Sequence, residues 1–71
     1  LIEKELKEIL LKAILYLDER QRNIIALKFG ANMKNREIAR MLDITESNVG
    51  TILYRSLKLL RDNLEKQGVN F

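Results

Sequence analysis

The 71-residue chain contains no cysteine, histidine, tryptophan or proline. Without cysteine, neither a disulfide nor a thiolate metal site can stabilise the fold. Without histidine, the usual zinc sites and the Ser–His and Cys–His nucleophile systems are excluded. The sequence also lacks a recognisable carboxylate pair and a glycine-rich phosphate loop. We therefore expect a protein that is not an enzyme and that binds neither a metal nor a cofactor.

Long hydrophobic runs are absent as well. No apolar run approaches the roughly 20 residues that span a bilayer, and no signal peptide is visible. We expect a cytoplasmic protein without a membrane partner. The chain starts at Leu1 rather than at a methionine, so we expect residues 1–71 to be a single domain cut from a longer protein.

Positive charge is concentrated in the middle of the chain, although the net charge is only +3. Residues 1–19 carry three cations against five carboxylates, residues 20–40 carry six against one, and residues 41–71 carry four of each. A basic segment of this kind suits a surface that faces phosphate groups. An ordinary solvated surface would have the same composition, and charge alone does not separate the two interpretations.

Apolar residues recur at three- and four-residue steps, and this periodicity predicts an all-α fold with four helices. The first helix is expected over about residues 2–16, with one apolar stripe. The second is expected over about residues 19–29, with Asp18 as its N-cap and Gln21 closing a capping box. The stripe on the first helix consists of Leu6, Ile9, Leu10, Ala13, Ile14 and Leu17.

A turn should separate the second helix from a short third helix. Gly30 and Asn32 end the second helix, because either residue can adopt the left-handed backbone that closes a helix. The third helix is expected over about residues 35–42. Its N-cap is either Lys34, whose side chain cannot accept a hydrogen bond, or Asn35, one residue later.

The segment from Glu37 to Arg61 has the pattern of a helix-turn-helix without a wing, a motif that places its second helix in the DNA major groove. Asp43 forms the turn, and Thr45 is the N-cap of a fourth helix that should run to about Lys66. The positions at which the two helices would cross are apolar or small, namely Ile38, Ala39, Leu42, Ile44, Val49 and Ile52.

The fourth helix has two chemically different faces when its residues are placed at roughly 100° steps. The core-facing side carries Val49, Ile52, Leu53, Ser56, Leu57 and Leu60. The opposite side is the candidate DNA-binding face, and it carries Ser47, Thr51, Tyr54, Arg55 and Lys58, with Asn48 on its border. These residue types can bond base edges or phosphates. The alternative is a polar face that is merely solvated.

Gly50 lies on the other border of this face and costs the helix about 1 kcal/mol relative to alanine. Close approach of DNA would explain that cost. Close approach of another helix would explain it equally well.

Three segments together resemble region 4 of bacterial RNA polymerase sigma factors, most closely the extracytoplasmic-function type. These segments are LDERQRNIIALKF at 17–29, EIARMLDIT at 37–45 and SNVGTILYRSLKLLR at 47–61. There are departures from the family pattern. Asn32 and Asp43 stand where glycine is usual, and Gly50 replaces a frequent basic residue. Ile52 and Leu57 are more like the housekeeping pattern, so the subclass stays open.

The resemblance implies sequence-specific binding of double-stranded DNA at the promoter −35 element, through the fourth helix. It also implies docking on the RNA polymerase core at the β-flap, and it allows an anti-sigma partner. The isolated domain should be a monomer. Carried over to this chain, Arg22 is a phosphate contact, and the recognition positions are Ser47, Asn48, Thr51, Tyr54 and Arg55. We add Arg36 and Lys58 from charge and geometry.

Two other functions remain open from the sequence. A LuxR-type transcriptional regulator shares the appearance of the segment NREIARMLDI, and it would bind a two-fold operator as a dimer. A protein-interaction module that has lost DNA binding would also fit, because Gly50 and the near-neutral fourth helix weaken the case for a DNA contact.

Overall fold

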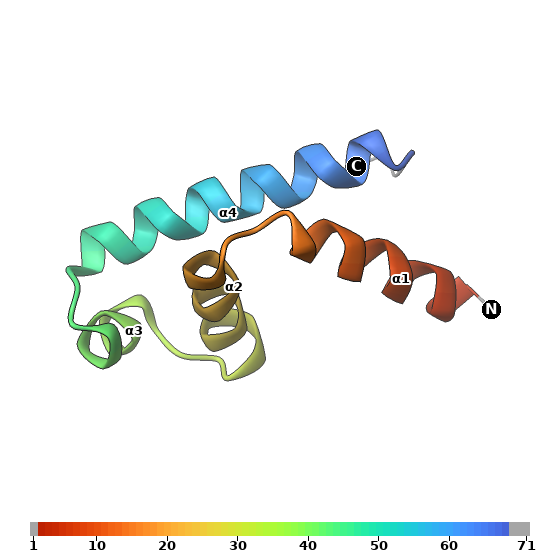
Figure 1. Ribbon diagram of the computed structural model, residues 1–71. Coiled ribbons are helices and arrows are strands. Elements are labelled where there is room, and N and C mark those ends of the chain that lie inside the picture. The colour runs from red at the N-terminus through yellow and green to blue at the C-terminus, as the bar shows by residue number, and fades with distance from the viewer. Residues whose placement is uncertain (1, 69–71) are drawn as a thin grey trace.

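The computed structural model describes residues 2–68, with side chains from residue 5 onward, and this part of the chain consists of helices and connecting turns (Figure 1). The helices are α1 (Ile2–Leu15), α2 (Glu19–Ile25), α3 (Asn35–Leu42) and α4 (Glu46–Lys66), and a π-helical turn, η1 (Ala26–Gly30), continues α2. The predicted all-α fold of four helices is confirmed. The sequence did not predict that the last turn of the second helix is π-helical.

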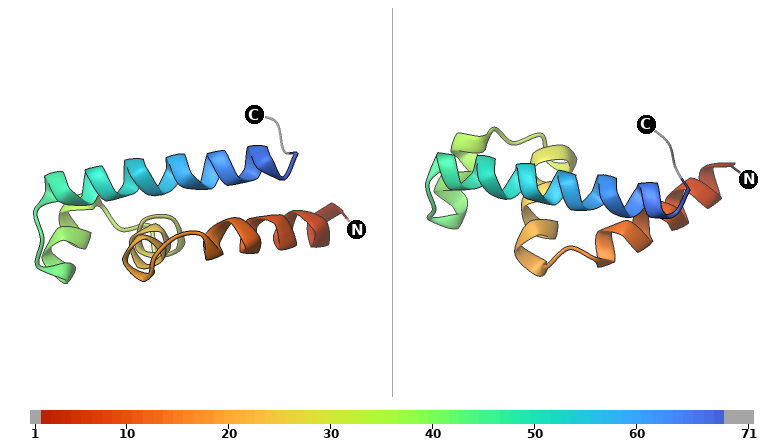
Figure 2. Two further views of the ribbon diagram at one scale, coloured as in Figure 1. Left: turned by 45° about the horizontal axis from the view of Figure 1, so that its top comes forward. Right: turned by 90° about the horizontal axis from the view of Figure 1, so that it is seen from above.

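The long helix α4 extends along most of the described structure and contacts each of the other α-helices (Figures 1 and 2). Helices α2 and α3 pack against its N-terminal half, while α1 lies beside its C-terminal half. The N-terminal half of α4 therefore forms the helix-turn-helix with α3, and the C-terminal half is held separately by α1.

The hydrophobic core lies where α2, α3 and α4 meet. Its fully or nearly fully buried members are Ile24, Ile38, Ala39, Val49 and Leu53. The remaining predicted crossing positions are half-buried and pack against this cluster, namely Leu42, Ile44 and Ile52. The predicted contact between the two helices of the motif is thus observed.

Leu57 differs from its predicted place in the core-facing stripe, because its side chain is 44% exposed. It lies at the edge of the stripe and lines open surface pockets rather than the core. The stripe on α1 is also only partly covered. Ala13 and Leu17 are buried, but Leu6 is 48% and Leu10 41% exposed.

Side-chain caps fix where three helices begin. Asp18 accepts from the backbone N–H of Gln21 at 2.8 Å, and Gln21 accepts from that of Asp18 at 3.0 Å, which is the predicted capping box. Thr45 caps α4 by accepting from the backbone N–H of Asn48 at 3.0 Å. At α3 the N-cap position is Lys34, whose backbone N–H donates to the Glu37 carboxylate at 2.9 Å. Only this half of the box exists, because an ammonium group cannot accept.

Asn32, one of the two residues predicted to end the second helix, and Asp43 in the predicted turn adopt the left-handed conformation, whereas Gly30 does not. Asn32 and Asp43 each have a φ of 55°. In the turn of the helix-turn-helix, Asp43 is followed by Ile44, whose backbone N–H donates to the Ala39 carbonyl at 3.0 Å. This bond returns the chain over the end of α3 and lets α4 begin only three residues after Asp43.

The left-handed turn yields a stability prediction. Asp43→Gly should leave the free energy of unfolding unchanged or raise it slightly, because glycine enters this region without steric cost. Asp43→Ala should lower it by about 1–2 kcal/mol. Urea unfolding followed by circular dichroism measures both. A loss above about 1 kcal/mol in the glycine variant would mean that the aspartate side chain itself is required.

Candidate nucleic-acid interface

The outer face of α4 is open, as its helical periodicity requires. Its candidate residues are all exposed, namely Ser47, Asn48, Thr51, Tyr54, Arg55 and Lys58. On the opposite side of the same helix, Val49 and Ser56 are 0% exposed and Leu53 is 7% exposed. Hydrophobic burial therefore sets the rotation of α4 about its own axis, and this rotation presents the polar residues to solvent.

Local hydrogen bonds decide which groups on this face are free. The Thr51 hydroxyl donates to the backbone carbonyl of Ser47 at 3.2 Å, so it has no hydrogen left to donate to a ligand, although its oxygen can still accept. The side-chain amide of Asn48 makes no hydrogen bond within the described residues. That amide can therefore both donate and accept toward a ligand.

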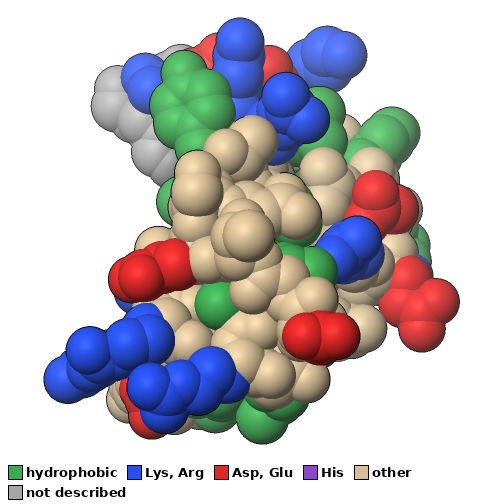
Figure 3. Space-filling view, turned by 90° about the vertical axis from the view of Figure 1, so that its left-hand side faces the viewer, with side chains coloured by type: hydrophobic (Ala, Val, Ile, Leu, Met, Phe, Trp, Pro, Cys, Tyr) green, Lys and Arg blue, Asp and Glu red, His purple; other side chains and the backbone are tan. Residues whose placement is uncertain are grey.

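Charged side chains surround a largely neutral centre on the end of the molecule formed by α3 and the start of α4. In Figure 3, which looks onto this end, the middle is mostly tan, Lys and Arg side chains gather above and below it, and Asp and Glu side chains lie to its left and right. Arg36 in the first turn of α3 is exposed, as are Arg55 and Lys58 on α4. Such a pattern suits a duplex whose bases face the centre and whose phosphates face the flanks.

The exposed cations of α3 and α4 are mostly unpaired. Among the side chains that the structure describes, the one ion pair joins Arg61 and Glu65 at 3.4 Å. Arg40, in the last turn of α3, is also exposed, although the sequence analysis did not select it. Its only sequence signal was membership of the basic segment at residues 20–40.

Arg22 is in a different situation from the other candidates. Its side chain is half-buried, and a guanidinium N–H donates to the backbone carbonyl of Leu17 in the turn between α1 and α2. The structure therefore gives Arg22 an internal role that the sequence did not predict. Within the described residues, the side chain of Arg22 makes no hydrogen bond to the outer face of α4.

No neighbouring atom in the structure explains why residue 50 is a glycine. A Cβ atom built at this position would meet nothing within 4 Å, and its φ is not positive. Close approach of another helix, one of the two explanations from the sequence, is therefore excluded among the described residues. The other explanation, close approach of DNA, stays a prediction.

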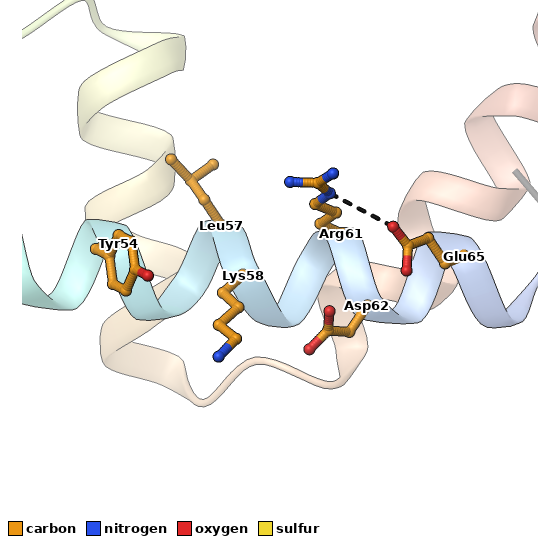
Figure 4. Close-up of a pocket in the computed structure, with 6 residues that line it drawn as sticks. All are labelled: Tyr54, Leu57, Lys58, Arg61, Asp62 and Glu65. Carbon is orange, nitrogen blue, oxygen red and sulfur yellow. Dashed lines mark ion pairs between the residues drawn. The ribbon is translucent and has the colours of Figure 1, made fainter. Parts of the chain in front are cut away.

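A second exposed region is apolar. In the C-terminal half of α4, Leu57, Leu60 and Leu64 line one surface pocket with Arg61. Figure 4 shows the neighbouring pocket, in which Leu57 lies between Tyr54 and the Arg61–Glu65 ion pair. Both pockets are open surface depressions along one helix, and they are lined by side chains without a catalytic arrangement.

Among the described residues, no group of three or more acidic side chains could hold a metal ion. None of the described helices has the length and hydrophobicity needed to cross a membrane.

An exposed polar second helix, fixed by a helix-turn-helix core and with exposed cations on both helices of the motif, is typical of helix-turn-helix DNA-binding domains. The particular family is also clear. The family model described as "Sigma-70, region 4" matches residues 7–60, and the chain belongs to this family. The match favours the sigma family over the LuxR-type regulator. It does not test the extracytoplasmic-function subclass, which stays a prediction.

Two similar relatives carry the same printed name, "RNA polymerase sigma factor SigF". They come from two strains of Mycobacterium tuberculosis, CDC 1551 / Oshkosh and ATCC 25618 / H37Rv. Each is 36% identical to this chain over 61 residues, which is 86% of this chain and 23% of the relative. The chain thus spans about a quarter of the length of the relatives it matches.

The open space at Gly50 makes a two-sided prediction. Gly50→Ala should raise the free energy of unfolding by about 1 kcal/mol, because alanine is the better helix former. The same change should weaken binding to a DNA duplex, because a methyl group then stands on the border of the outer face. Urea unfolding and fluorescence anisotropy measure the two effects.

Gly30→Ala is the matched control. A Cβ at Gly30 also meets nothing within 4 Å, but Gly30 lies outside α4. DNA affinity should be unchanged in this variant. Unchanged affinity in Gly50→Ala as well would show that no ligand needs the space at Gly50.

Proposed function

We propose that this domain recognises the promoter −35 element as the DNA-binding part of a bacterial sigma factor, acting in the cytoplasm without catalysis. The observation that carries the proposal is the exposed polar face of α4, held outward by the burial of Val49 and Leu53 in a sigma-70 region 4 fold. The printed name of the relatives, RNA polymerase sigma factor, supports the same function.

The proposed interface divides into base contacts and phosphate contacts. The exposed residues of α4 from Ser47 to Arg55 face the floor of the major groove. Lys58, further along α4, and Arg36, on α3, bind the sugar-phosphate backbone on either side of them. Arg22 joins the phosphate contacts through the guanidinium N–H groups that its bond to Leu17 leaves free.

Salt dependence separates the two kinds of contact. Arg36→Ala should weaken binding to all duplexes alike and reduce the slope of log affinity against log salt by about one, because one phosphate contact is lost. Arg55→Ala should weaken binding to the promoter by about 1–3 kcal/mol, because it removes a base contact. The variant should bind unrelated duplexes nearly as tightly as the parent does.

Fluorescence anisotropy over a series of salt concentrations, with a promoter duplex and a scrambled duplex, measures both variants. Arg22→Ala belongs in the same series. If Arg22→Ala has the parent's slope of log affinity against log salt but a lower free energy of unfolding, Arg22 has only its internal role. Failure of the parent domain to bind any duplex at about 50 mM salt would overturn the proposed function itself.

We propose further that the RNA polymerase core, at its β-flap, docks on the uncovered part of α1. Leu6 and Leu10 lie on the same side of α1 as the buried Ala13, because residues three, four and seven positions apart share a helix face. They are nevertheless exposed, so the apolar stripe continues past the part that α4 covers. An uncovered apolar stripe is typical of a helix that packs against a partner.

Leu6→Glu should lower the affinity of the domain for the polymerase core at least tenfold, because a carboxylate would be buried against an apolar partner. The matched control is Leu15→Glu. Leu15 is 76% exposed and lies about half a turn away from Leu6 around α1, so its variant should bind polymerase normally. Pull-down and surface plasmon resonance with the core enzyme measure the difference. Equal losses in the two variants would remove this stripe as the docking site.

A further inference from the structure

The part of α4 that faces the centre of the DNA-binding end carries no positive charge. Its first nine residues, Glu46–Tyr54, contain neither lysine nor arginine, and the first cation on the helix is Arg55. In Figure 3 the middle of this end is mostly tan, with carboxylates beside it. The first nine residues of α4 therefore offer no cationic side chain to a base, and Arg55, directly after them, offers the first.

Guanine is normally read by the charged groups that this region lacks. The commonest specific contact to a guanine is a bidentate bond from Arg or Lys to its O6 and N7 atoms. Adenine is read by a carboxamide, which accepts from the N6 amino group and donates to N7. Thymine is recognised by apolar contact with its methyl group. The side chains available on Glu46–Tyr54 therefore favour A·T pairs.

Hydrogen bonding within the helix strengthens this preference. Asn48 is exposed, and its amide has no partner within the described residues, so both of its polar atoms are available to a base. Thr51 donates its hydroxyl hydrogen to the Ser47 carbonyl, so toward a base it has a methyl group and an accepting oxygen but no donor. One residue thus has the group that adenine requires, and another has the group that packs against thymine.

Glu46 is the only charged residue in this region, and a carboxylate can accept from cytosine. Its position argues against that role. Glu46 lies about 100° around the helix from Ser47, on the side away from Thr51 and Asn48. Its negative charge is instead placed to stabilise the positive end of the α4 dipole.

We propose that the base pairs contacted by Glu46–Tyr54 are A·T pairs, that Asn48 selects an adenine among them, and that any guanine in the element is read by Arg55. This inference rests on the proposed function and goes further, because it names the composition of the DNA element and the residue that selects one base.

Selection from a duplex library tests the proposal. The 71-residue chain, checked for helical structure by circular dichroism, is incubated with duplexes randomised over about ten base pairs, one turn of DNA. Bound duplexes are sequenced for the parent and for three variants. The parent should select an element with a continuous A·T segment.

Each variant has a distinct expected outcome. Asn48→Ala should relax the preference for one adenine by about 5- to 150-fold and leave the other positions unchanged. Arg55→Ala should relax a guanine position outside the A·T segment. Lys58→Ala is the control, and it should lower all affinities alike without changing the selected sequence.

Two results would overturn the inference while leaving DNA binding intact. One is a selected element in which the position relaxed by Asn48→Ala is a G·C pair. The other is an Asn48→Ala variant that loses affinity for all sequences alike. If instead the parent binds no duplex, the proposed function fails, and the inference fails with it.

Discussion

The burial of Val49 and Leu53 against Ile24 and Ile38 is the interaction on which the rest of the structure depends. A helix of this length can rotate about its own axis unless side chains fix it, and these are the buried side chains that α4 contributes to the central cluster. Once they face inward, helical periodicity leaves no other direction for Ser47, Thr51 and Tyr54 than outward. The chemistry of the binding face is therefore set by hydrophobic contacts that do not themselves touch a ligand.

The short turn between α3 and α4 fixes where the outward face of α4 lies relative to α3. Because Asp43 takes a left-handed conformation, the chain reverses within a few residues and α3 and α4 cross at the core. Helix α3, which carries Arg36 in its first turn, then lies at the same end of the molecule as the start of α4, so a phosphate contact and base contacts can belong to one duplex (Figure 1). Thr45 contributes by holding the first turn of α4 in helical form, where the proposed base contacts are made.

Local sequence signals predicted much of this arrangement, and the failures share a physical cause. The capping box at Asp18, the cap at Thr45 and the left-handed Asp43 depend on a few neighbouring residues, so their patterns are readable in the sequence. The exposure of Leu57 and of Leu6 was not readable, because periodicity says which side of a helix is apolar but not how far a neighbouring helix extends along it.

The internal hydrogen bond of Arg22 could not be predicted from the sequence either. Its bond to the Leu17 carbonyl depends on how α2 is placed relative to the turn before it. The open space at Gly50 likewise needed coordinates, since an absent neighbour leaves no trace in the sequence.

The 21 residues of α4 form one uninterrupted rod, about 30 Å long, that joins the proposed DNA-binding end of the domain to the end packed against α1. Gln67, just past the end of α4, connects this helix to α1, because its side-chain N–H donates to the backbone carbonyl of Ile9 at 3.2 Å. The rod is therefore held at both ends, by α2 and α3 at one and by α1 at the other. A tilt of about 5° would displace one tip by roughly 2–3 Å relative to the other. The two ends can thus change their relative alignment only if the helices packed on them move as well.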